Sequence, residues 1–362
     1  ERLLLDIIRR KEPIVRSFIH PLTPLTQPSV HRILDNLLDK QLITVGEAIV
    51  NGPGKPSPEI CLNRMFYYSV GILVNTDAIT ICLANLACEL VSQISFEGQS
   101  HNRDHALRRI QQEVHTMLET EGITENNLTG ICLSIAGTFI GKKNQVNASL
   151  PLKEWSLVDL GALLSRYFQA PISVENNAKA GAIGESFLGV GRWADTFVYL
   201  SFNYGFGGGV IIDGKPFYGA HGNALDISSI FEDDSMPKRP ALGPLIQHLN
   251  SYGVNIQTVA ELRTQFDPKW PGVAEWIEQT LPQLNRAIWA ICATIDPQVI
   301  VFGGEIPRSL ADIFIERVSV YNTSKFRYDV PKPASKLVFT EAPNVGAALG
   351  AAMKPLKVQF FL

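Results

Sequence analysis

The feature that most constrains the fold is a glycine cluster between two short apolar strands. Residues 197–200 are apolar, Gly205 and Gly207–Gly209 follow, and Val210–Ile212 form a second apolar run. The Asp213-Gly214 pair that comes next is a strong signal for a tight hairpin turn. Glycines at such a place let the backbone approach a ligand closely and adopt a positive φ. Because no helix is predicted directly behind the cluster, it is neither a Rossmann fingerprint nor a Walker loop.

The composition is that of a globular chain without an overall electrostatic attraction to nucleic acid. Of its 362 residues, 46% are hydrophobic and 19% are charged, and the net charge is −3. Any DNA contact must therefore come from a local patch. No apolar run approaches the roughly 20 residues of a membrane helix and no secretory signal is visible, so we expect a cytoplasmic protein without a membrane partner. The five cysteines form no C-x-x-C pair, which argues against a disulfide framework or a zinc knuckle.

Three helices are predicted in the first forty residues. Apolar side chains recur at helical spacing over residues 3–8, and Pro13 ends that helix. A tight turn precedes the last helix, over residues 25–38, for which Thr26 is a good N-cap. Pro28 falls in its first turn, where a missing N–H costs little. This order is the plan of a helix-turn-helix, whose last helix reads the major groove through its N-terminal residues.

Two short strands are predicted next, over residues 41–45 and 48–50. With the Gly54-Lys55-Pro56 tail, this arrangement resembles the winged helix-turn-helix of repressors of the ROK family (repressors, open reading frames and sugar kinases). The glycine order of residues 201–224 resembles the signature of the same family. A short basic loop suits a minor groove. The alternative is a head that serves in dimerisation or docking. The candidate DNA-binding residues are Arg16, Gln27, Ser29, His31, Arg32 and Lys55.

From residue 66 onward the pattern predicts alternating strands and helices, among them strands over residues 68–74 and 171–178 and helices over residues 155–168 and 273–294.

The resemblance to the ROK family covers essentially the whole chain. It implies an α/β protein in which an N-terminal winged helix-turn-helix precedes a two-lobed, actin-like ATPase body of the sugar-kinase type. We expect residues 1–62 to form the DNA-binding head and residues 63–178, with 345–362, to form the N-terminal lobe. Residues 179–344 would form the C-terminal lobe, through which the chain dimerises. The aromatic tail at residues 359–362 would dock against the head, as a C-terminal helix does in ROK repressors.

Three departures from the family pattern bear on catalysis. ROK kinases open with an Asp-x-Gly-Gly-Thr phosphate loop, whereas residues 71–80 lack the glycine pair and the acidic residue in place. The kinases carry an Asp after an Asn as general base, whereas this chain has Asn176-Asn177, and an amide cannot accept that proton. The Glu-x-Gly-His motif and the cysteine-rich zinc loop expected after Ala224 are also missing. We therefore expect no catalytic residue, no metal and no bound ATP.

The resemblance also implies a sugar between the two lobes. The positions that match the sugar contacts of the family are Asn147, Asn176, Asn177 and Asp226, with Ser229 in place of the usual histidine. Amide and carboxylate side chains suit hydroxyl-rich ligands because they take part in several directed hydrogen bonds. The simpler interpretation is that Asn147 is a turn residue and that Asn176 caps a strand end. The relics of the nucleotide loop would be Gly205, Gly207, Gly208, Gly209, Gly303 and Gly304.

Together these residues predict a NagC/Mlc-like transcriptional regulator of carbohydrate metabolism, and a repressor in particular. Its head would bind a double-stranded DNA operator as a homodimer or a higher homo-oligomer, while its body would sense a sugar or a sugar phosphate. Two other functions stay open. One is a ROK-type sugar kinase with an added head, and the other is a sensor that binds a partner protein instead of a sugar.

Overall fold

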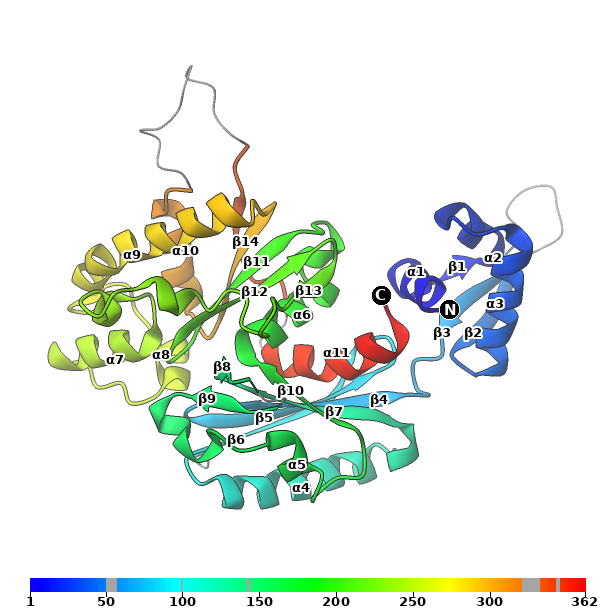
Figure 1. Cartoon of the computed structure of the whole chain (residues 1–362), viewed down its shortest axis with the longest axis horizontal. Helices are drawn as coiled ribbons and strands as arrows, with labels where there is room; N and C mark the ends of the chain where they lie inside the picture. The colour runs from blue at the N-terminus through cyan, green and yellow to red at the C-terminus, as the bar shows by residue number, and fades with distance from the viewer. Residues whose placement is uncertain (50–56, 99, 142–143, 321–332, 343–345) are drawn as a thin grey trace.

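The protein consists of a small head and two lobes, each lobe built on a five-stranded sheet (Figure 1). The computed structural model describes residues 1–49, 57–98, 100–141, 144–320, 333–342 and 346–362. The predicted tail at residues 54–56 and its Lys55 lie outside this range. Both chain ends lie where the head meets the body. None of the helices in the described ranges is long and apolar enough to cross a membrane.

The head combines short helices with a three-stranded sheet of order β1-β3-β2. The strands expected at residues 41–45 and 48–50 are one strand, β2, with a register shift between Val45 and Ala48, so that prediction was wrong. An irregularity of this kind bends a strand without ending it. The elements are α1 (Arg2–Lys11), β1 (Ile14–Val15), α2 (Arg16–Ile19), η1 (His20–Leu22), α3 (Gln27–Asp39), β2 (Ile43–Ile49) and β3 (Ser57–Leu62).

The first lobe is a sheet of order β10-β7-β4-β5-β6, whose outer face α4 and α5 cover (Figure 1). The predicted strand at residues 68–74 is confirmed, but the helix predicted over residues 155–168 is reduced to the five residues of α5. Leu157, with φ of 61°, interrupts it, since a bulky residue in the left-handed region cannot continue an α-helix. The elements are β4 (Tyr68–Val74), β5 (Ala78–Asn85), β6 (Leu90–Glu97), α4 (Arg103–Thr120), η2 (Glu125–Asn127), β7 (Leu128–Ile135), β8 (Gly137–Phe139), β9 (Val146–Ala148), η3 (Leu150–Trp155), α5 (Leu160–Leu164) and β10 (Ile172–Asn176).

The second lobe is a sheet of order β13-β12-β11-β14-β15 with α7 to α10 packed beside it. The hairpin turn at Asp213-Gly214 is confirmed, since both residues have positive φ. The glycine run 207–209 lies inside β12, not in a loop, and none of its residues has a positive φ. The elements are η4 (Val190–Arg192), β11 (Phe197–Phe202), β12 (Phe206–Ile212), β13 (Lys215–Phe217), η5 (Ile227–Ile230), η6 (Met236–Lys238), α7 (Leu242–Ser251), α8 (Val259–Gln265), α9 (Val273–Thr294), β14 (Val299–Gly304), α10 (Arg308–Arg317) and β15 (Lys336–Phe339).

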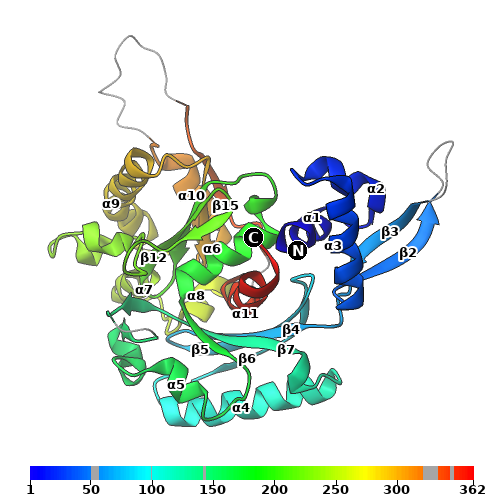
Figure 2. The ribbon, with the colours of Figure 1, turned by 45° about the vertical axis from the view of Figure 1, so that its right-hand side comes forward.

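Two helices, α6 (Asn177–Leu188) and α11 (Gly346–Phe360), lie side by side between the two sheets (Figure 2). They approach closely because Gly184 and Gly350 face the neighbouring backbone, where an added Cβ would overlap it. Residues 177–178 begin α6 and do not extend the preceding strand, contrary to the strand predicted over 171–178. The pair of helices therefore forms the buried centre of the body.

The head and the body share one hydrophobic core. Leu4, Leu5 and Ile8 of α1 belong to the same cluster of buried side chains as Phe187 of α6 and the C-terminal half of α11. Phe361 is fully buried there, and its carbonyl oxygen accepts a hydrogen bond of 2.7 Å from Nε of Arg2. This contact confirms the predicted docking of the tail against the head.

Candidate functional site

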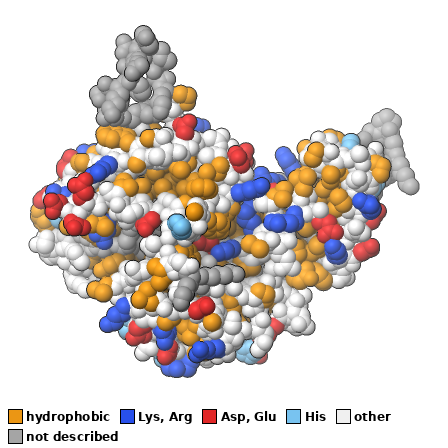
Figure 3. Space-filling model, viewed as in Figure 1, with side chains coloured by type: hydrophobic (Ala, Val, Ile, Leu, Met, Phe, Trp, Pro, Cys, Tyr) orange, Lys and Arg blue, Asp and Glu red, His pale blue; other side chains and the backbone are white. Residues whose placement is uncertain are grey.

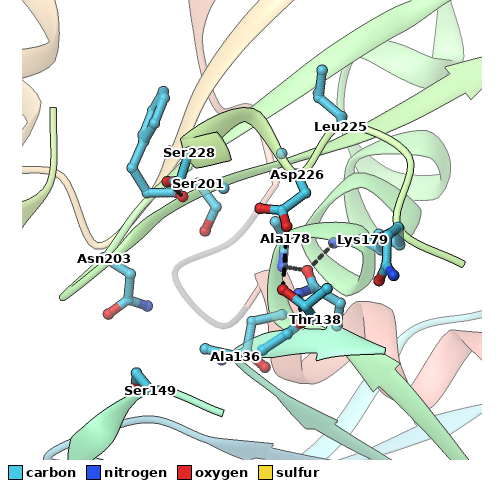
Figure 4. Close-up of a pocket in the computed structure, with 18 of the residues that line it drawn as sticks. Ala136, Thr138, Ser149, Ala178, Lys179, Ser201, Asn203, Leu225, Asp226 and Ser228 are labelled. Atoms are coloured by element: carbon cyan, nitrogen blue, oxygen red, sulfur yellow. Dashed lines mark hydrogen bonds between the residues drawn. The ribbon is translucent and has the colours of Figure 1, made fainter. Parts of the chain in front are cut away.

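A cleft of about 360 Å³ lies between the two lobes. It is bounded by the ends of β7 and β10, the first turn of α6, the β11–β12 turn and the segment from residue 223 to residue 239 (Figure 4). Parallel strands of α/β proteins deliver ligand-binding side chains at their carboxyl ends. The polar residues that line the cleft are Thr138, Ser149, Asn176, Asn177, Lys179, Ser201, Asn203, Asn223, Asp226, Ser228 and Arg239.

Asn176 acts as the N-cap of α6. Its Oδ1 accepts hydrogen bonds from the backbone N–H groups of Ala178 (2.9 Å) and Lys179 (3.3 Å), and its Nδ2 donates to the carbonyl of Gly137 (2.9 Å). Helix N-termini leave these N–H groups unpaired unless a side chain caps them. Asn176 is the last residue of β10 and caps the start of α6, so its contacts are those that the capping interpretation expects at a strand end.

Asn177 lies at the floor of the cleft with its amide directed into the protein. Its side chain donates from Nδ2 to the carbonyl of Val74 (3.3 Å) and to Oδ1 of Asn75 (3.1 Å), while Oδ1 accepts from the Ser134 hydroxyl (2.8 Å). The residue is only 5% exposed. Because both N–H donors are occupied, Asn177 can offer a ligand no more than one acceptor lone pair.

The β4–β5 hairpin, which matches the phosphate loop of the kinases in the sequence, contacts the second lobe. Asn75 Oδ1 accepts a second hydrogen bond from Nδ2 of Asn203 (3.2 Å). Asp77 Oδ2 accepts from the N–H groups of Val259 (3.0 Å) and Ala260 (3.3 Å) at the start of α8. The carboxylate of this hairpin is therefore committed to a contact between the lobes.

A second set of contacts joins the lobes on the other side of the cleft. The Asn223 side chain donates to the carbonyl of Phe139 and accepts from its N–H, both at 2.8 Å. Asp226 Oδ2 accepts from the Thr138 hydroxyl (3.2 Å), as Figure 4 shows. Hydrogen bonds thus join the two lobes at both edges of the cleft.

Two of the five predicted sugar-binding residues lie away from the cleft lining. Asn147 is an exposed residue of β9, paired in register with Thr138. Ser229 is exposed as well, and its hydroxyl donates to the carbonyl of Asp226. The structure therefore brings together Asn176, Asn177 and Asp226 and places Asn147 and Ser229 outside the lining.

Three of the six predicted nucleotide-loop glycines line the cleft, and the other three do not. Gly205, Gly207 and Gly208 line the cleft. A Cβ added to Gly209 would lie 2.7 Å from the Cβ of Ala182, so that glycine permits contact between β12 and α6. Residues 303–304 pack against Tyr199, whose hydroxyl accepts a hydrogen bond of 2.7 Å from the Gly304 N–H.

Five further residues at the cleft were not predicted from the sequence: Asn75, Lys179, Asn203, Asn223 and Arg239. A signal for the asparagines was present, because all three follow a strand end or stand in a turn rich in glycine. Lys179 and Arg239 gave no such signal, since neither belongs to a motif.

The head presents a separate surface along α3. Its groove is lined by Gln27, Pro28, His31, Arg32, Asp35 and Asn36. Gln27 and Arg32 are exposed. Ser29 exchanges a hydrogen bond with the hydroxyl of Thr26 (2.9 Å), the residue at the N-cap position. Arg16 is turned onto the helix, where it pairs with Asp35 (2.5 Å) and donates to the carbonyl of His31 (3.2 Å).

Basic side chains gather where the head meets the body (Figure 3). Arg9 and Arg10 of α1 and Lys357 of α11 line a small pocket there, and the guanidinium of Arg9 lies 4.3 Å from the ring centre of Phe187. Burial first, and then the neighbouring charges of Arg9 and Arg10, lower the pKa of Lys357 to about 8, although Asp6 opposes this. Phe187 stands near the end of α6, so the helix that begins at the cleft ends beneath the head.

Most of the residues that line the cleft lie in a segment that matches a known protein family. Residues 69–233 match the family model described as ROK family. The chain is 27% identical over 319 residues to the protein y4fQ of Sinorhizobium fredii, an alignment that covers 88% of this chain and 81% of that protein. It is 26% identical over 239 residues to the xylose repressor of Bacillus subtilis, and that alignment covers 66% of this chain and 62% of the repressor.

Solved structures share the fold at lower identity. A ROK family transcriptional regulator, a homologue of the E. coli MLC protein, aligns with a TM-score of 0.71 and 17% identity over 98% of this chain and 97% of that chain. A ROK family glucokinase from Streptomyces griseus, in complex with glucose and AMPPNP, aligns with a TM-score of 0.60 and 16% identity over 79% of this chain and 98% of the kinase. The fold of the body is therefore the mixed α/β fold that ROK regulators and ROK sugar kinases share.

Proposed function

Because residues 69–233 form a ROK family domain, we propose that this chain is a transcriptional repressor of carbohydrate metabolism whose kinase-like body is a sensor without catalytic activity. Xylose repressors among its relatives and the fold shared with an MLC homologue support this proposal. The head binds a double-stranded DNA operator, and the cleft between the lobes binds a sugar effector. Two copies of the chain bind one operator.

The head is proposed to be a winged helix-turn-helix in which α3 enters the major groove. Gln27, His31 and Arg32 lie on the face of α3 that lines its open groove. The ion pair between Arg16 and Asp35 supports this role because it neutralises the carboxylate on that face, which would otherwise repel DNA phosphates. The β2–β3 hairpin is then the wing.

Loss of kinase chemistry is supported by the contacts of the residues at the kinase positions. The Asn177 amide is bonded to Ser134 and Asn75, and it cannot accept a proton from a sugar hydroxyl. Asp77, the carboxylate nearest the phosphate-loop position, caps α8 of the second lobe. Neither group is available to position phosphates or a metal ion.

The observation that carries the proposal is the course of α6. This helix starts at the cleft with Asn177 and ends beneath α1, where Phe187 contacts Arg9. Its 12 residues span about 18 Å at 1.5 Å per residue. A ligand that changes how the lobes contact each other at the first turn of α6 therefore acts on a rigid helix whose other end contacts the head. Differential binding to two such arrangements is what an effector needs to shift DNA affinity.

The test is selection of genomic DNA fragments with the purified full-length chain, followed by titration of the enriched site with a panel of sugars that includes xylose. We expect a palindromic site whose affinity changes with one sugar. Arg32→Ala should weaken binding by about 5- to 150-fold, the range for one base-specific contact, while Arg166→Ala on the exposed surface of the first lobe should leave it unchanged. Absence of any selected site would overturn the repressor proposal, and phosphorylation of a hexose by ATP would overturn the sensor assignment.

A further inference from the structure

The charged side chains that line the cleft are two cations and one carboxylate. Lys179 and Arg239 carry the positive charges and Asp226 carries the negative one. Neither cation forms an ion pair within the described part of the chain. A neutral sugar requires no such excess of positive charge, since its hydroxyls are satisfied by amide, hydroxyl and carboxylate groups.

Lys179 is the more informative cation because it is buried. The residue as a whole is 6% exposed, and within the described residues its ammonium group forms neither a hydrogen bond nor an ion pair with another side chain. An ammonium group taken from water without a partner is costly. The nearby carboxylate of Glu175 does not serve it, because Glu175 is paired with Lys354 at 2.9 Å. Burial lowers the pKa of Lys179, although the charges of Glu175 and Asp226 oppose this shift.

Lys179 lines the cleft, so its positive charge is available to a ligand bound there. The residue lies in the first turn of α6, and Figure 4 shows it on the same side of the cleft as Asp226, while Asn203 stands across from them. The N-terminus of α6, a helix of twelve residues, adds the positive end of a helix dipole at the same place, while Asn176 already caps the N–H groups of residues 178 and 179. A buried cation and a helix start thus face one cavity.

We propose that the effector of this cleft is an anionic sugar, whose phosphate or carboxylate group is bound by Lys179 while its hydroxyls meet the asparagines and Asp226. The volume of about 360 Å³ suits a single sugar unit, as it lies near the lower limit for small-molecule sites. This inference rests on the proposed function of the cleft as a sugar sensor, and it adds the charge class of the sugar and the residue that selects it.

Calorimetric titration of the full-length chain tests the inference with matched ligands: neutral hexoses and xylose, the 6-phosphates of the same hexoses, the corresponding uronic acids, and inorganic phosphate alone. We expect one anionic sugar to bind more tightly than its neutral counterpart. The phosphate and uronate arms identify which acidic group is recognised.

Three variants make the assignment specific to Lys179. Lys179→Gln should weaken binding of the anionic sugar by about 10- to 150-fold, the value of one hydrogen bond to a charged group, without lowering the melting temperature. Lys179→Arg should retain part of the affinity, and Lys238→Gln, an exposed lysine that does not line the cleft, should retain all of it.

The outcomes separate this inference from the proposed function. If a neutral sugar binds, alters DNA affinity and is indifferent to Lys179→Gln, the inference is wrong while the repressor proposal stands. If the chain selects an operator but binds no sugar of either charge class, both the inference and the sensor role of the cleft are wrong.

Discussion

Asn177→Asp is the substitution that most directly tests our account of the cleft, because it restores the carboxylate of the kinase position at constant side-chain size. In the wild type, Nδ2 donates to Val74 and Asn75. A carboxylate there would place an oxygen against two acceptors at a site that is 5% exposed. Rotation of the Asn75 amide would supply one donor, but it would break the hydrogen bond that Asn203 donates to Asn75.

The magnitude follows from these contacts. Each lost hydrogen bond costs about 1 kcal/mol, and a buried group left without its partner costs about 1–3 kcal/mol, so we expect a loss of about 3 kcal/mol at neutral pH. Burial beside acceptors favours the protonated acid, which raises the pKa of the new carboxyl above the reference value of about 3.9. The folded state then binds more protons than the unfolded state above that pH, and the destabilisation grows as the pH rises through this window.

Urea denaturation measured from pH 4 upward is the appropriate assay, with Asn126→Asp as the control. Asn126 is exposed and gives the same change of charge and size outside the cleft. We expect the control to stay within about 0.5 kcal/mol of the wild type. An Asn177→Asp protein as stable as the wild type at neutral pH, or one whose relative stability does not depend on pH, would refute the inward orientation of the amide.

Two further predictions concern the junction of the head and the body. Phe361→Ala removes a fully buried ring from the shared core. It should lower the free energy of unfolding by about 3–5 kcal/mol and make the head susceptible to limited proteolysis. Val358→Ala, at an exposed position of the same helix end, should have neither effect. Lys357→Met should abolish a rise in the stability of the wild type between pH 8 and 10.5, because the unfolded state binds more protons in that range than the folded state, in which the pKa of Lys357 is lowered. If chemical denaturation shows a stability difference between the two proteins that does not change across this range, the partly buried position of the ammonium is contradicted.

The sequence was sufficient for elements whose pattern is local and strong. The predicted helix at residues 273–294 and the strand at residues 68–74 have those bounds in the structure, because long amphipathic or wholly apolar runs leave few alternatives. The helix predicted over residues 155–168 was wrong because the positive φ of Leu157 is not visible in a periodicity. Glycines 207–209 were predicted in a loop, but they lie within β12, where Gly207 and Gly209 pack close to α6.

For the candidate site, motif matching identified positions but not orientations. Asn176, Asn177 and Asp226 do line the cleft, yet the amide of Asn177 is satisfied by Ser134 and Asn75, which are distant in the sequence. Hydrogen-bond partners of a buried amide depend on which strand ends meet, and this depends on the order of the sheet.

The amino-acid sequence by itself determined the class of protein: the glycine order, the helical spacing at the start of the chain and the missing phosphate loop are chemical facts of the chain and need no coordinates. Only the tertiary structure decided what these parts do together. It made Asp77 a cap for α8 and placed the end of α6 beneath the head. It also left Lys179 buried without an ion-pair partner among the residues that the structure describes. These properties arise from contacts between residues far apart in the chain, and local sequence preferences carry no information about them, because burial and pairing are decided by packing.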